Sequence, residues 1–207
     1  MSQRTGPGQH PAWPGPAHYS GAAPIRVLTG MTEQPSVTKA KCILGAVADG
    51  LIRELVSYWL RIHPGDGLPG RQNFDPVDVP RLLPHLLLTD VHGPPYRFRA
   101  RVVGTAVVEA IGKDFTGAYL DEALPGFADT SGAADRVDVV ETGLPSYRCG
   151  LATMPFPLDF APIERVYLPF ASDGRKVDLI LAGMVYLVSS CAGSKPAPGG
   201  CIRLSSD

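Results

Sequence analysis

One stretch of this chain, residues 96–117, constrains the fold more than any other. Its first half alternates charged and apolar side chains: Arg97, Phe98, Arg99, Ala100, Arg101, Val102. A period of two places the arginines on one face of a strand and the apolar groups on the other. After Gly104 the apolar residues recur at helical spacing until Gly112. The stretch therefore predicts a strand that passes through a glycine turn into a short helix, which ends at a second glycine.

The chain around this stretch supplies more strands. Residues 86–91 form an apolar run that predicts a buried strand, and the turn 92–95 makes residues 96–103 its hairpin partner. Further strands are expected at residues 145–153, 163–171 and 177–188. A tight turn at residues 172–175 joins the last two, and its glycine supplies a positive φ.

The helical signals surround these strands. Asp49 is the predicted N-cap of an amphipathic helix that reaches Ile62 and is ended by residues 63–65. Trp59 is interpreted as a core or dimer contact in preference to a gate over a ligand cavity. Leu55 and Trp59 are the residues expected at an interface.

Shorter helical elements complete the pattern. Asp75 is expected to cap a helical turn, and residues 120–124 form a brief helix. Residues 131–142 predict a helix with Val137 and Val140 inward and with a glycine cap. Because the last strands have only short connectors, we expect an α+β fold, an antiparallel five-stranded sheet with helices on one face and with an N-terminal amphipathic helix.

The two ends of the chain are rich in Pro, Gly and Ser. We expect residues 1–48 to be a disordered or weakly ordered leader and residues 189–207 a disordered tail. Met31 leaves open where translation begins. Between these ends, residues 49–188 are expected to form a single domain.

Composition excludes several classes of function. With 19 basic and 20 acidic residues, the chain has no clustered positive field for nucleic acid, and no apolar run suits a membrane. The N-terminus lacks the apolar block of a signal peptide, so a cytoplasmic protein is expected. The cysteines and histidines are dispersed, and no metal site is expected.

Taken together, several short motifs resemble those of the PAS superfamily, in particular the small bacterial PAS domain-containing proteins of unassigned activity. They are Tyr58-Trp59, Asp75-Pro76, Leu82-Leu83-Pro84, Arg99-Ala-Arg-Val-Val-Gly-Thr105, Gly112-Lys-Asp-Phe-Thr-Gly117, Leu168-Pro169 and Asp173-Gly174. The resemblance spans residues 51–188. It implies a sheet in the order 2-1-5-4-3, with the helices between strands two and three covering a potential ligand cavity.

The resemblance supports no particular cofactor. Haem-binding members of the superfamily carry an axial histidine on the long helix, and residues 131–142 contain none. Flavin photosensors carry an adduct-forming cysteine in an Asn-Cys-Arg motif, which Cys149 does not match. We therefore expect neither group.

The sequence also does not match the enzyme motifs that were considered. Residues 112–117 have the span of a phosphate loop, but Ala118 stands where lysine is needed. There is no Gly-x-Ser-x-Gly nucleophile motif, and each pair of acidic residues is explained by a helix cap or a solvated face. No catalytic residue is expected, and the chain is not expected to be an enzyme.

The arginine alternation leaves three interpretations open. Arg99 and Arg101 lie on a solvated sheet face, face an acidic partner surface or the N-terminal helix of another protomer, or bind an anionic ligand inside the cavity. The cavity border is expected to include Thr105, Val108, Ile111, Phe115, Thr116, Tyr147 and Tyr186.

The leading hypothesis is a regulatory PAS-like sensor module that binds a small molecule or a regulatory protein and carries no output domain. The small molecule or partner would act by binding one of two conformations of this protein more tightly than the other. The second hypothesis is a constitutive interaction or dimerisation scaffold with a self-filled core, which uses residues 49–62 and the sheet face for docking or for a homodimer. Neither hypothesis identifies the ligand or the partner.

Overall fold

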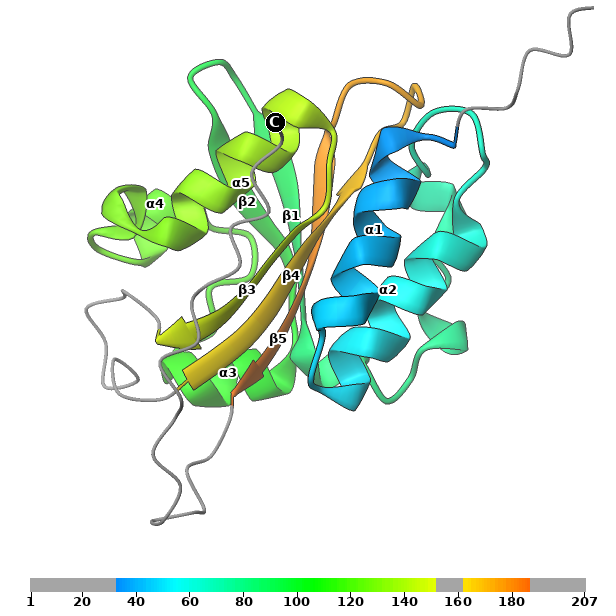
Figure 1. The fold of residues 1–207 in the computed structure, drawn as a ribbon. Helices are drawn as coiled ribbons and strands as arrows, with labels where there is room; N and C mark the ends of the chain where they lie inside the picture. The colour runs from blue at the N-terminus through cyan, green and yellow to red at the C-terminus, as the bar shows by residue number, and fades with distance from the viewer. Residues whose placement is uncertain (1–32, 152–161, 187–207) are drawn as a thin grey trace, which may run out of the picture. The chain divides into compact units, whose positions relative to one another are not determined.

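A computed structural model describes residues 33–151 and 162–186 of the chain (Figure 1). The helices are α1 (Pro35–Ala46), α2 (Gly50–Ile62), α3 (Thr105–Ile111), α4 (Leu120–Ala123) and α5 (Ser131–Thr142). The strands are β1 (Leu86–His92), β2 (Arg97–Val103), β3 (Ser146–Leu151), β4 (Pro162–Phe170) and β5 (Leu179–Tyr186). Short 3-10 turns lie at Arg71–Asn73, Pro76–Asp78, Leu83–His85 and Phe127–Asp129.

The strands form one antiparallel sheet in the order β2-β1-β5-β4-β3, as the resemblance implied. All of the expected strands are present. The predicted strand residues 152–153 and 187–188 lie outside the described part of the chain, as do the expected tail and the first 32 residues. The predicted glycine turn is also confirmed, because Gly174 has a φ of 74°.

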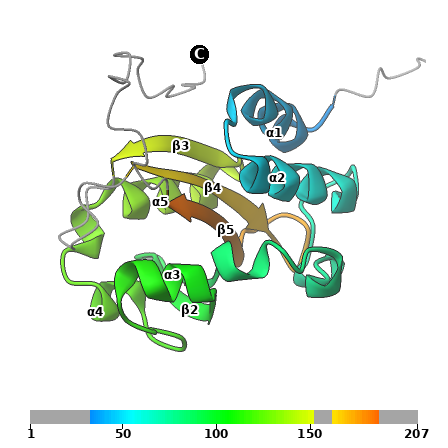
Figure 2. The same cartoon turned by 90° about the horizontal axis from the view of Figure 1, so that it is seen from below.

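Helices pack on both faces of the sheet: the helices between β2 and β3 cover one face, as expected, and the N-terminal helices α1 and α2 cover the other. Figure 2 shows α1 and α2 on one side and α3 and α4 on the other. Gly183 of β5 makes the close packing of α2 possible, because a Cβ there would meet the side chains of Leu55 and Ile52. The sheet is therefore the middle layer, and its two faces have different partners.

The capping prediction for α2 is confirmed. The Asp49 carboxylate accepts hydrogen bonds from the backbone N–H groups of Leu51 and Ile52 at 2.7 and 3.2 Å. Trp59 is fully buried, and its indole N–H donates to the carbonyl of Pro169 at 3.1 Å. Leu55 is 1% exposed. Both side chains belong to this chain's own core, so the prediction that they form an interface is wrong.

Helix α1 lies in the segment that the sequence predicted to be a disordered leader, and that prediction is wrong for residues 35–46. Pro35 occupies a first-turn position, where its missing N–H costs nothing. The buried face carries Ser36, Ala40 and Ile43, followed by Val47 after the helix. Two of these residues are small, so the helical periodicity of apolar groups is weak in the sequence.

A histidine joins the start of α1 to the end of α2. The N–H of Gly65 donates to His63 Nδ1 at 3.2 Å, so the neutral ring carries its proton on Nε2, which lies 3.1 Å from the Ser36 hydroxyl. Burial lowers the pKa of His63 below its ordinary value of 6.5. The folded state therefore favours the neutral form of this ring more than the unfolded chain does.

This arrangement predicts an acid-sensitive stability. Because the pKa of His63 is lowered in the folded state, its contribution is complete above pH 6.5 and is lost as the pH falls from 6.5 towards the folded pKa. Urea unfolding of the full chain at a series of pH values should show this loss, and His63→Gln should reduce it. The matched control, His92→Gln, changes an exposed ring and should leave the pH dependence as it was. Equal pH profiles for His63→Gln and the natural chain would contradict this account.

Helix α5 forms where predicted, and Gly143 caps it with a φ of 67°. Val137 and Val140, predicted to point inward, are partly buried and pack against the core. Asp135, Arg136 and Val139, which were not predicted to be inward, are more deeply buried. Two charged residues therefore face the sheet, and they lead to the candidate site.

Candidate functional site

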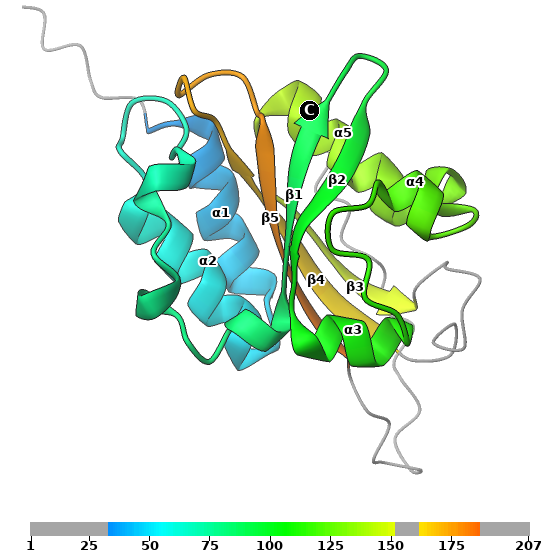
Figure 3. The ribbon, with the colours of Figure 1, turned by 180° about the vertical axis from the view of Figure 1, so that it is seen from behind.

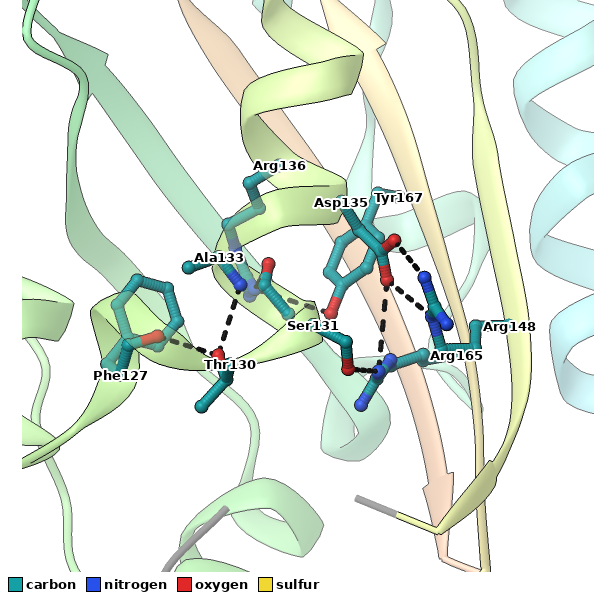
Figure 4. Close-up of polar contacts among 10 residues, drawn as sticks. Phe127, Thr130, Ser131, Ala133, Asp135, Arg136, Arg148, Arg165 and Tyr167 are labelled. Atoms are coloured by element: carbon teal, nitrogen blue, oxygen red, sulfur yellow. Dashed lines mark hydrogen bonds and ion pairs between the residues drawn. The ribbon is translucent and has the colours of Figure 1, made fainter. Parts of the chain in front are cut away.

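A cluster of buried and partly buried polar side chains lies between α5 and the sheet (Figure 4). Asp135 and Arg136 come from α5, Arg148 from β3, and Arg165 and Tyr167 from β4. The β3–β4 register places Arg148 directly opposite Arg165, so the two side chains share one face of the sheet. Residues far apart in sequence are thus brought together by the strand register.

One carboxylate anchors this cluster. Arg148 Nε and Nη2 donate to the two oxygens of Asp135 at 2.9 and 2.6 Å, which is a bidentate pair. Arg165 Nη2 lies 3.8 Å from Asp135 and donates to the Ser131 hydroxyl at 2.6 Å. Among the described residues, the ion pairs of these arginines all go to Asp135.

Arg136 is the most enclosed member of the cluster and is 2% exposed. Its guanidinium lies 5.5 Å from the ring centre of Phe127 and 4.5 Å from that of Tyr167. Its Nη1 donates to the Gly132 carbonyl at 2.9 Å and to the Tyr167 hydroxyl at 3.3 Å. Burial lowers the pKa of Arg136, and the nearby charge of Arg165 lowers it further.

Two hydrogen-bond donors in this cluster have no acceptor in the described structure. Arg136 Nε and Arg165 Nε are buried and make no hydrogen bond, in a structure described over residues 33–151 and 162–186. Arg165 is 6% exposed, so water does not readily satisfy it. Buried donors are nearly always paired in folded proteins, and an unpaired one calls for a partner. These two Nε–H groups are therefore buried donors that the described residues leave without an acceptor.

Tyr186 of β5 lies on the same face. It is the register partner of Ile163, two residues before Arg165 along β4. Burial raises the pKa of Tyr186 to about 12, against the opposing effect of the Arg165 and Arg136 charges. Its hydroxyl has one weak acceptor in the described structure, the Met184 sulfur at 3.8 Å. Tyr186 therefore remains a protonated donor beside the two arginines.

The other face of β4 carries a second buried charge, Glu164, which is fully buried. Its carboxylate accepts from the backbone N–H groups of Ala48 and Asp49 at 3.0 to 3.1 Å and from the Tyr147 hydroxyl at 2.9 Å. Burial and this hydrogen bond raise the pKa of Tyr147. Glu164 thereby ties the linker between α1 and α2 to the sheet.

The arginines singled out from the sequence are not part of the cluster. Arg97 of β2 pairs with Asp121 and Glu122 and stacks 3.9 Å from the ring centre of Tyr119. Arg99 is exposed and donates to the Gly117 carbonyl at 2.9 Å, and Arg101 is exposed and lies 3.3 Å from Asp90. Figure 3 shows their strand at the edge of the sheet. The solvated-face interpretation fits these positions, and the placement of Arg99 and Arg101 in a cavity is wrong.

The remaining predicted ligand residues fall into separate places. Thr105 and Thr116 are exposed, Val108 and Ile111 are partly buried on α3, and Phe115 is buried in the core. Tyr147 faces Glu164 on the α2 side of the sheet, so its predicted position at the α5-side cavity is wrong. Of the predicted set, Tyr186 is the residue that lies beside the cluster.

Sequence reasoning missed Asp135, Arg136, Arg148 and Arg165. One signal was available, because Glu164 and Arg165 are adjacent charges inside a strand that is otherwise apolar. Charged residues are rarely fully buried unless they are paired, so such a pair indicates a polar site on each face of the strand. The partners themselves depend on the packing of α5 and on the β3–β4 register.

No metal centre is evident within the described ranges, where no three His, Cys, Asp or Glu side chains gather. In the same ranges, no helix has the length and apolar character needed to cross a membrane.

A comparison with curated proteins found no match. The sequence model of a family described as PAS domain matches residues 50–184, which is more than half of the 207-residue chain and includes β1 to β4 and most of β5. Domains of this kind are in general sensory or regulatory modules. With this match and the β2-β1-β5-β4-β3 sheet, the chain belongs to the PAS domain family.

Proposed function

We propose that this protein is a regulatory sensor module that binds a small molecule between α5 and the sheet and relays binding to α1 and α2. The observation that carries the proposal is the pair of buried, unpartnered donors, Arg136 Nε and Arg165 Nε. These donors do not stabilise the fold, because each unpaired buried donor costs free energy. A bound molecule would supply the missing acceptors.

The relay runs through β4, whose side chains alternate between the two faces of the sheet. Arg165 belongs to the cluster beneath α5, and its neighbour Glu164 holds the backbone of Ala48 and Asp49. A shift of β4 on binding therefore changes the fit of the α1–α2 linker on the other face. Signalling in this form requires the molecule to bind one of the two arrangements more tightly than the other.

A thermal unfolding screen of the full chain tests the proposal. A molecule that binds the folded state raises Tm, and the rise grows with its concentration. We expect at least one compound of a metabolite panel to do so in the natural chain and to lose its effect in the Arg136→Met/Arg165→Met double variant. A panel without any saturable response would instead favour the alternative, a scaffold whose core is filled by its own side chains.

The relay makes a separate prediction about hydrogen exchange. A compound that raises Tm should change the exchange rates of the Ala48 and Asp49 amides, which Glu164 holds. In Glu164→Gln the link to β4 is weakened, so the change at these amides should shrink while the rise in Tm persists. Unchanged exchange at both amides on binding would remove the relay from the proposal.

A further inference from the structure

We infer that the molecule bound beneath α5 is a small oxyanion, with a carboxylate or a phosphate group, held by Arg136, Arg165 and Tyr186. This inference rests on the proposed function, because it names the chemical class of the ligand for the same site. The argument comes from the charge and the free donors of the cluster.

The charges of the cluster do not balance among the described residues. Three guanidinium groups, those of Arg136, Arg148 and Arg165, face one carboxylate. That carboxylate, Asp135, is held by Arg148 through both of its oxygens, and its distance of 3.8 Å to Arg165 is too long for a hydrogen bond. Positive charge therefore remains on the side of Arg136 and Arg165.

Arg136 has the strongest need for a counter-charge. It is 2% exposed, and its described acceptors are a carbonyl and a hydroxyl, both neutral. Removing a cation from water costs several kcal/mol unless an opposite charge and further hydrogen bonds offset it. The rings of Phe127 and Tyr167 supply part of this compensation.

A neutral ligand would not supply both the missing hydrogen-bond acceptors and the missing negative charge. A carbonyl or an ether oxygen would accept from one Nε–H but would leave the buried positive charge without a partner. An oxyanion offers several acceptor sites together with the negative charge, and guanidinium groups bind such groups with the strongest hydrogen bonds found in proteins. Tyr186 adds a third donor, because its hydroxyl has only a thioether sulfur as acceptor in the described structure.

Binding of inorganic phosphate and of succinate to the full chain tests the inference. Each sodium salt is titrated by calorimetry and by thermal unfolding at constant ionic strength, against sodium chloride. The two probes separate a phosphate from a carboxylate ligand. Arg136→Met and Arg165→Met each remove one donor and one charge, and Tyr186→Phe removes the third donor. Arg175→Met is the matched control, because Arg175 is an exposed arginine of the β4–β5 turn.

We expect saturable binding of at least one probe, with a Tm rise of about 5 to 10 °C at a hundredfold excess over Kd. Either arginine variant should weaken binding by at least about tenfold, since each loses a hydrogen bond to a charged group. Arg175→Met should bind as the natural chain does. The arginine variants alone should be at least as stable as the natural chain, because methionine replaces an incompletely paired charge.

A small rise in Tm that does not saturate and is equal in all variants would overturn the inference, because phosphate stabilises proteins generally by exclusion from their surfaces. A marked loss of stability in the arginine variants without any probe would also count against it. If neither probe binds but a neutral compound of the metabolite panel does, the oxyanion inference fails and the sensor proposal stands. If nothing binds, both fail.

Discussion

Asp135→Ala is expected to lower the free energy of unfolding by about 3 to 5 kcal/mol, as measured by urea denaturation of the full chain. The reason is the charge of the cluster beneath α5. Asp135 is the carboxylate that pairs with Arg148 and lies near Arg165, and it is 8% exposed. Without it, the buried guanidinium groups keep their cost of desolvation and lose their attraction to a counter-charge.

The control for this variant is Asp138→Ala, which removes an exposed carboxylate from the same helix and should change stability by less than about 0.5 kcal/mol. A loss below about 1 kcal/mol for Asp135→Ala would mean that the cluster is well solvated, which contradicts its described burial.

The second large effect is expected on the opposite face of the sheet. Glu164→Ala should also cost about 3 to 5 kcal/mol, because it leaves the amides of Ala48 and Asp49 and the hydroxyl of Tyr147 without their acceptor. Glu164→Gln keeps an acceptor oxygen, so its cost should be smaller. The same denaturation experiment measures both variants.

Helix α1 should respond to this change more than the rest of the protein does. Hydrogen exchange in Glu164→Ala should increase in α1 and in its linker to α2 before it increases in β5, the central strand. Glu54→Ala, an exposed change on α2, is the control and should have little effect. A uniform increase over all elements would indicate global destabilisation without a specific role in docking α1.

Much of the fold was predictable because its signals are local. The alternation in residues 97–103, the caps at Asp49 and Asp75, and the glycine after α3 each depend on neighbouring residues. A period of two or of 3.6 is written directly into the order of side chains. Helix α1 was missed because its buried face includes a serine and an alanine, which carry little hydrophobic contrast.

The candidate site was not predictable in the same way. The arginines of β2 and those of the cluster are the same residue type, and alternation alone cannot separate a solvated face from a covered one. Arg165 is buried because α5 lies over β4, and it meets Arg148 because of the β3–β4 register. Both are tertiary features, which no window of neighbouring residues contains.

Native mass spectrometry of the purified full chain, compared with the mass after denaturation, tests the sensor account most directly. The protein is first supplied with the compounds that raise its Tm, or with phosphate and succinate. The account predicts a complex heavier by the mass of one small molecule, which is lost on denaturation and is absent in Arg136→Met/Arg165→Met. A single unliganded mass under all of these conditions would contradict it.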